Sequence, residues 1–128
     1  MVDPLVKELL EQAVDTPVKL QLLLMFHENP RMEATPQVIA DRVCRDIWSV
    51  NQALYELAHD GIMLQAATAN GDSVYRYGPT LEFQDAIDRL ITGYDDPFTR
   101  DALHETLRNL MRHAIVYRPS DPWEPLVA

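Results

Sequence analysis

The chain has 128 residues, of which 47% are hydrophobic and 24% are charged, a composition typical of one globular domain rather than of a disordered or fibrous protein. The net charge is -9 at pH 7, and this sign repels polyanions such as nucleic acid. The single cysteine, Cys44, excludes a disulfide within the chain and a cluster of thiolate metal ligands. We expect a cytoplasmic protein without membrane contact, because the sequence shows neither a secretory signal pattern nor an apolar run of membrane-spanning length.

Two helices are predicted at the start of the chain, each introduced by a capping residue and a proline. The Asp-Pro pair at 3–4 precedes a stripe of apolar residues with helical spacing over 5–14. The Thr-Pro pair at 16–17 precedes a helix that is apolar on most of its circumference, over 18–26. Because Asn-Pro at 29–30 disfavours helical geometry, this second helix ends there, and its composition predicts a place at the centre of the domain.

The next segment predicts two helices joined by a tight turn. Thr-Pro at 35–36 begins a helix of barely two turns that ends at Val43, and Cys44 and Arg45 leave room only for a short turn. Asp46 can cap the following helix, which Gly61 ends. The side chains expected to point inward from the first of these helices are Val38, Ile39 and Val43. A short helix, a tight turn and a longer helix form a helix-turn-helix, which holds its second helix where a DNA major groove can accept it.

A β-hairpin and two further helices follow. Residues 62–66 are extended in character, Asn-Gly-Asp at 70–72 signals a turn, and residues 74–77 alternate as a returning strand. Helical spacing then recurs over 80–91 and again from Pro97 to near Arg118. We therefore expect a mainly α fold with a small β-hairpin. Its divisions are an N-terminal helix at 1–16, a helix-turn-helix domain with its hairpin at 17–78, a C-terminal helical extension at 79–118 and a tail at 119–128.

This pattern resembles the winged-helix transcription regulators of the MarR, ArsR and PadR type, over about half of the chain. The residues that carry the resemblance are Ile39, Ala40, Val43, Val50, Leu54, Leu57, Gly61, Ile62 and Met63. The hairpin around residues 67–74 takes the place of the wing, and Cys44 stands where these proteins usually have glycine. The resemblance implies a winged helix-turn-helix core whose C-terminal helices are of the dimerisation type.

The resemblance also implies a set of DNA-contacting residues. They lie on the outer face of the helix that follows Asp46 and at the base of the wing: Trp48, Ser49, Asn51, Gln52, Tyr55 and Arg76. Asn and Gln side chains can each pair with an adenine edge, although an exposed Asn-Gln pair is also common on a solvated surface. Arg42 and Arg45 flank the turn and are candidates for phosphate contacts. The alternative for these two arginines is pairing with the neighbouring Asp41 and Asp46.

We expect the protein to form a dimer, because its helix-turn-helix domain has few positive charges. Residues 17–78 contain five basic residues, whereas a strong DNA binder makes about six to ten phosphate contacts. A dimer would double the contacts and would place two recognition helices about 34 Å apart, one turn of DNA. The apolar stripe expected to form its interface is Leu103, Leu107, Leu110, Met111 and Ala114. The alternative is that this stripe packs inside its own chain.

The sequence therefore predicts a homodimeric DNA-binding transcriptional regulator. The alternative is an acidic winged-helix module that docks on another protein through Trp48 and Tyr55, with no DNA binding. An apolar pocket for a small-molecule effector is a further possibility, with Met63, Tyr77, Phe83 and Met111 as its lining. We expect no enzyme activity, no cofactor and no metal, since the four histidines lack metal-site spacing and no catalytic constellation is present.

Overall fold

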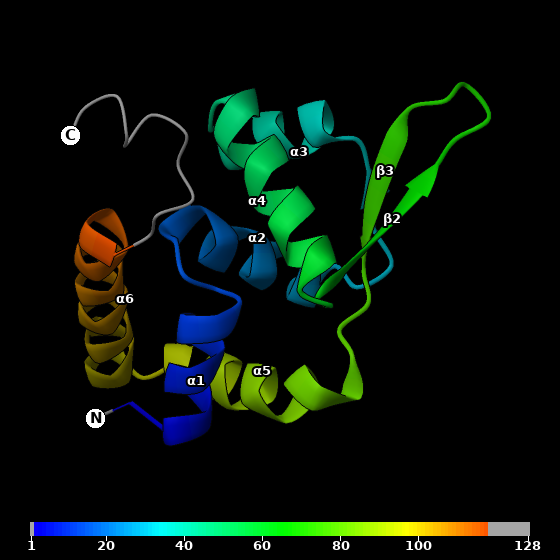
Figure 1. Cartoon of the computed structure of the whole chain (residues 1–128). Helices are drawn as coiled ribbons and strands as arrows, with labels where there is room; N and C mark the ends of the chain where they lie inside the picture. Colours follow the sequence, from blue (N-terminus) through cyan, green and yellow to red (C-terminus); the bar gives the residue numbers. More distant parts are fainter. Residues whose placement is uncertain (1, 118–128) are drawn as a thin grey trace.

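The computed structural model describes residues 2–117, and from residue 113 onward it describes the backbone alone. This part of the chain is mainly helical, with a small antiparallel sheet of three strands (Figure 1). The elements in chain order are α1 (Pro4–Gln12), α2 (Pro17–Glu28), β1 (Glu33–Ala34), α3 (Pro36–Val43), α4 (Ile47–His59), β2 (Met63–Ala67), β3 (Ser73–Tyr77), α5 (Leu81–Tyr94) and α6 (Pro97–Tyr117). The predicted tail at 119–128 lies outside the described residues.

Side-chain caps begin α1, α2, α3 and α4 at the positions that the sequence predicts. Asp3, Thr16 and Thr35 each precede a proline and each accept a hydrogen bond from a backbone N–H of the first turn of α1, α2 and α3. Asp46 caps α4 in the same way, with its carboxylate 2.8 Å from the Ser49 nitrogen. These caps satisfy backbone donors that have no partner within the helix, which is why the helices start at these residues.

The sheet has the strand order β1-β3-β2, and all its pairs are antiparallel. The hairpin β2–β3 turns at Gly71, whose φ of 85° suits the Asn-Gly-Asp turn, and it projects from the body in Figure 1. β1 was not predicted from the sequence. It has only two residues, Glu33 and Ala34, which carry no alternating pattern, and it exists through its pairing with Arg76 and Tyr75 of β3.

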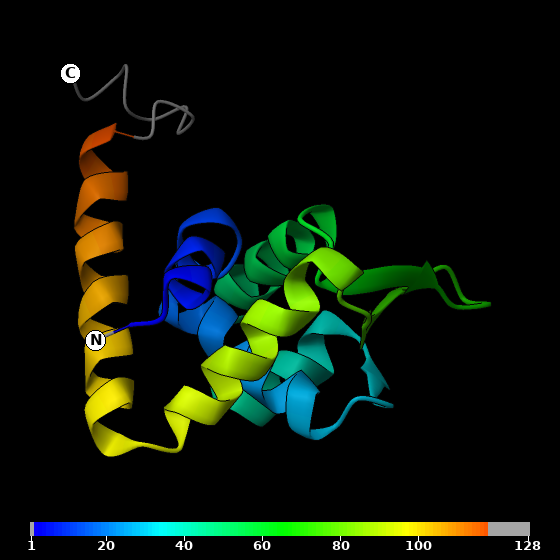
Figure 2. The same cartoon turned by 90° about the horizontal axis from the view of Figure 1, so that it is seen from below.

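The hydrophobic core lies where α2 packs against α4, with α1 and α5 packed against each other alongside (Figure 2). The inner residues of α2, among them Leu22, Leu23 and Phe26, have no exposed surface, which confirms its predicted central place. Val38 was predicted to point inward, and this is wrong, because its side chain is 53% exposed. The short helix α3 buries a single stripe that contains Ile39 and Val43, and Val38 falls on its other side.

The turn between α3 and α4 passes through a left-handed residue, Cys44, with φ 58° and ψ 45°. The backbone N–H of Arg45 donates to the carbonyl of Ala40 at 3.1 Å, and that of Cys44 donates to Asp41 at 3.4 Å, which closes the end of α3. Glycine is the residue that adopts this geometry without steric cost. The side chain of Cys44 is exposed, so it is not a buried filler of the turn.

Cys44→Gly should therefore raise the free energy of unfolding by about 1 kcal/mol, because it removes the strain of a left-handed residue with a side chain. Urea denaturation followed by circular dichroism measures this gain. Cys44→Ala is the matched control, since it removes the thiol and keeps the Cβ, and it should give no gain. An equal gain in both variants would mean that the sulfur, rather than the backbone conformation, is the source of the strain.

Candidate nucleic-acid interface

The two sides of α4 differ sharply in burial. Val50, Leu54 and Leu57 face the core with no exposed surface. The opposite side carries the residues predicted to contact DNA, and all of them are exposed: Trp48, Ser49, Asn51, Gln52 and Tyr55. The exposed fraction reaches 81% for Trp48 and 59% for Tyr55, which is unusual for aromatic side chains. The helix thus presents amides, a hydroxyl and two aromatic rings to the outside.

The hairpin lies beside this side of α4. Tyr55, Ala58 and His59 of α4 line a shallow hollow together with Met63 and Leu64 of β2, so the helix and the hairpin form one continuous surface. Arg76, predicted at the base of the wing, is exposed on β3, the middle strand of the sheet, opposite Glu33 and Leu64. The structure therefore places Arg76 beside the strand that adjoins α4.

The two arginines at the turn are exposed: Arg42 lies in the last turn of α3, and Arg45 lies in the turn that precedes α4. The guanidinium of Arg42 approaches the sulfur of Met32 at 2.8 Å, and Nε of Arg45 donates to Oε1 of Gln21 at 2.6 Å. Within residues 2–117, neither forms an ion pair with the neighbouring aspartates. Hydrogen bonds from the backbone N–H and the hydroxyl of Ser49 hold the pKa of Asp46 below its usual value, so that a negative charge remains next to Arg45.

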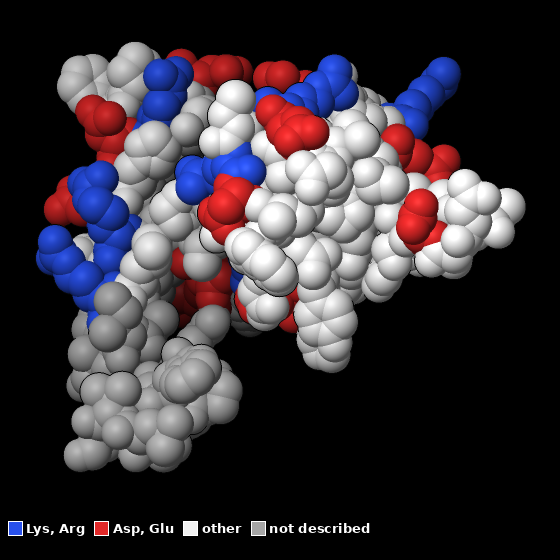
Figure 3. Space-filling view, turned by 90° about the horizontal axis from the view of Figure 1, so that it is seen from above, with Lys and Arg blue, Asp and Glu red and all other residues white. Residues whose placement is uncertain are grey.

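The charge on this side of the molecule is sparse and mixed. Figure 3 shows the molecule from above, with mostly uncharged side chains over its middle and with Asp and Glu among the Lys and Arg. The sequence of α4 contains no Lys or Arg, and Glu56 is its one acidic residue. Phosphate contacts would therefore depend on arginines outside α4.

A buried ammonium group lies beneath this surface, and sequence reasoning missed it. Lys19 of α2 is only 3% exposed, and its Nζ lies 2.7 Å from Oδ1 of Asp15 and 2.5 Å from Oε1 of Glu56. Oε2 of Glu56 accepts a hydrogen bond from the amide of Gln52 at 2.5 Å. Burial opposes ionisation of Glu56, but the hydrogen bonds from Lys19 and Gln52 outweigh it and hold the pKa of Glu56 below its usual value. The signal in the sequence was a lone lysine in a helix that is apolar on most of its circumference.

The residues of the predicted dimer stripe on α6 differ in how far they are buried. Leu103 and Leu107 are 1% and 2% exposed, because they pack inside their own chain, which is the alternative left open by the sequence. Leu110 is half-buried and Met111 is 36% exposed, whereas the side chain of Ala114 lies outside the described residues. Figure 2 shows α6 standing along one side of the body. A dimer interface on α6 could use Leu110 and Met111 but not the two buried leucines.

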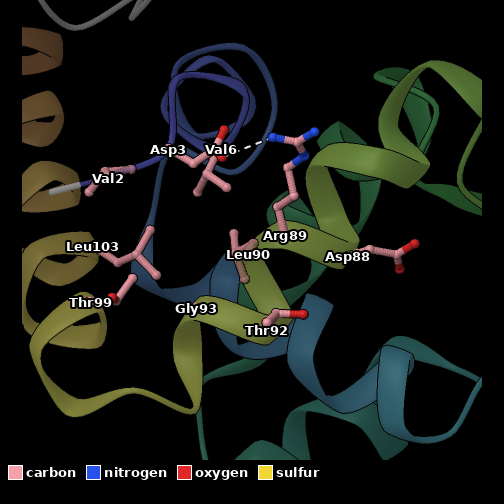
Figure 4. A pocket seen from close by; sticks show the side chains of 10 residues that line it. All are labelled: Val2, Asp3, Val6, Asp88, Arg89, Leu90, Thr92, Gly93, Thr99 and Leu103. Atoms are coloured by element: carbon pink, nitrogen blue, oxygen red, sulfur yellow. Dashed lines mark hydrogen bonds and ion pairs between the residues drawn. The ribbon is translucent and has the colours of Figure 1, made fainter.

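Two further hollows flank α6. One, of about 480 Å³, lies between α2 and α6, and Arg45, His104 and Arg108 are among its lining residues. The other, of about 380 Å³, lies between α1, α5 and α6 (Figure 4). In Figure 4 the guanidinium of Arg89 points to Asp3, at 3.0 Å, and Asp85 also accepts from it. The charge of Arg89 is therefore already balanced within the chain.

Two of the residues suggested for an effector pocket, Met63 and Phe83, line different hollows. Met63 lines the hollow beside α4, whereas Phe83 lines a hollow between α1 and α5. Met63 and Phe83 are largely buried. Tyr77 is half-buried, and this burial raises the pKa of its hydroxyl to about 12. Core packing explains Met63 and Phe83.

In residues 2–112, whose side chains the structure describes, no group of three His, Cys, Asp or Glu side chains is arranged to hold a metal ion. The hydroxyl of Tyr94 lies 2.9 Å from Nε2 of His104 at the start of α6. None of the helices described between residues 4 and 117 combines the length and the hydrophobicity that a membrane span requires.

Comparison with known proteins adds no assignment. The chain matches no family model, no curated protein and no solved structure.

Proposed function

We propose that residues 17–78 are a winged helix-turn-helix domain that binds duplex DNA, with α4 in the major groove and the hairpin β2–β3 as the wing. The order helix, strand, helix, helix, strand, strand supports this reading, as does the tight turn between α3 and α4. The observation that carries it is the outer side of α4, where every residue predicted to contact DNA is exposed.

The side chains on this surface offer the chemistry that base reading needs. Asn51 and Gln52 each present an exposed amide. Such an amide can donate a hydrogen bond to N7 of adenine and accept one from the N6 amino group of the same base. The exposed guanidinium groups of Arg42, Arg45 and Arg76 supply contacts to phosphates on either side.

We further propose that the protein is a transcriptional regulator that acts as a homodimer in the cytoplasm. Three arginines are few for a tight complex, and two copies would supply six. The exposed part of α6, with Leu110 and Met111, is the surface left for such pairing among the residues first predicted for it. Two α4 helices about 34 Å apart would then enter successive turns of one groove.

Fluorescence anisotropy of labelled duplexes tests the proposal. If six phosphates are neutralised, the affinity should fall by about 10³-fold between about 50 and 200 mM salt, because counterions are released on binding. A duplex pool enriched on the protein should bind more tightly than random duplexes at every salt concentration. Absence of binding at about 50 mM salt would refute DNA recognition.

A second candidate function is supported by the aromatic residues. Trp48 is 81% exposed and α4 has no positive charge, so this surface also suits docking on another protein. If this is the function, Trp48→Ala should abolish capture of one defined partner protein. Neither the wild type nor this variant should then bind duplex DNA. Salt-sensitive, sequence-selective duplex binding by the wild type would count against this candidate.

A further inference from the structure

A continuous set of polar contacts connects the interior to the outer side of α4. It starts at the buried Nζ of Lys19, which lies 2.5 Å from Oε1 of Glu56. The other carboxylate oxygen of Glu56 accepts from Nε2 of Gln52 at 2.5 Å, one helical turn earlier. Gln52 is exposed, whereas Lys19 is not. An exposed amide is thus tied to a group whose position is fixed by the core.

The chemistry of these groups determines which way the amide points. A lysine ammonium only donates hydrogen bonds, and an ionised carboxylate only accepts them. The nitrogen of the Gln52 amide must therefore face Glu56, and its carbonyl oxygen is directed away from Glu56. One N–H and the carbonyl oxygen stay available to a ligand, and this pair complements the N7 acceptor and the N6 donor of adenine.

We propose that Glu56 is a positioning residue for base recognition: held by Lys19, it fixes the amide of Gln52 so that this residue selects adenine at one position of the bound duplex. The inference rests on the proposed DNA-binding function and deepens it. Without this tie, an exposed glutamine would sample several rotamers and would lose that freedom on binding.

The proposal makes an unusual prediction for Glu56→Gln. Lys19 stays paired with Asp15, but its ammonium only donates, so the new carbonyl oxygen should face this ammonium and the new NH₂ group should face Gln52. Two NH₂ groups cannot hydrogen-bond to each other, so the amide of Gln52 should rotate and present its NH₂ group outward. Guanine offers two acceptors, O6 and N7, in the major groove. The preferred base at this position should therefore change from adenine to guanine.

Selection from a randomised duplex pool with the full chain tests this. Wild type should enrich a sequence in which one adenine is favoured about tenfold, and Gln52→Ala should lose that preference alone. Glu56→Gln should favour guanine at the same position. Glu105→Gln, an exposed control on α6, should keep adenine. Retention of adenine by Glu56→Gln, or an unchanged preference in Gln52→Ala, would overturn the proposal.

Two measurements separate the possible failures. If wild type enriches no sequence, the proposed function itself fails, whereas enrichment without a preference linked to Gln52 refutes only the role of Glu56. If Glu56→Gln does not fold, the side-chain amides of free wild type still give an answer by NMR relaxation. The order parameter of the Gln52 amide should exceed about 0.6, and that of exposed Asn109 on α6 should lie below it. Equal mobility of the two amides would overturn the proposal.

Discussion

Lys19→Ala should lower the free energy of unfolding by about 3 kcal/mol, because it removes the ammonium that lies between two carboxylates. In the folded protein Lys19 is 3% exposed and bonds to Asp15 and Glu56, so the variant would leave two negative charges close together beneath the surface. Urea denaturation at pH 7 measures the loss. The effect should be among the largest for any single polar residue, since the ion pair joins α2 to α4 across the core.

Two controls separate charge from packing. Lys7→Ala changes an exposed lysine on α1 and should cost less than about 0.5 kcal/mol. Lys19→Met keeps most of the side-chain volume and removes the charge, so its loss should approach that of Lys19→Ala if the ion pairs dominate. A loss below about 1 kcal/mol in Lys19→Ala would contradict the view that this lysine stabilises the fold.

The double variant Asn51→Ala, Gln52→Ala should weaken binding to a selected duplex by about 100-fold, since each amide that pairs with a base contributes about 1–3 kcal/mol of discrimination. Binding to random duplexes should change little, because phosphate contacts by arginines are sequence-independent. Competition anisotropy at constant salt measures both affinities. Both side chains are exposed, so folding should be retained.

Asn109→Ala is the matched control for this loss, because it makes the same change at an exposed position on α6. Its affinity for the selected duplex should equal that of wild type. An equal loss for selected and random duplexes in the double variant would mean that the amides act on general affinity and do not read bases. Unchanged affinity would remove both residues from the candidate interface.

Local signals in the sequence were sufficient for most elements. Proline after a capping residue predicted the starts of α1, α2 and α3, and Asn-Gly-Asp predicted the turn of the hairpin. Such signals act between residues a few positions apart, so one sequence displays them directly. The exposed side of α4 followed from the same kind of spacing, because its inner stripe of Val50, Leu54 and Leu57 leaves the other side to solvent.

Long-range contacts could not be predicted in this way. Lys19 and Glu56 are 37 positions apart, and only the packing of α2 against α4 brings them together. β1 depends on a partner strand about forty residues later, and an apolar stripe on α6 does not reveal whether it packs on its own chain or on a second copy. The burial of Leu103 and Leu107 in the structure shows that these two residues pack inside their own chain.

The strand order has a consequence for the behaviour of the protein in concentrated solution. In the described sheet, β3 has neighbours on both sides, whereas each outer strand has a free edge: β1, which has only two residues and carries Glu33, and the longer β2. Residues 64–67 of this strand are exposed, and its sequence, MLQAA, contains no charge and no proline. Charged residues and proline are the usual protection of an edge strand against pairing with another molecule. The hairpin edge is therefore the place where self-association through strand pairing would begin.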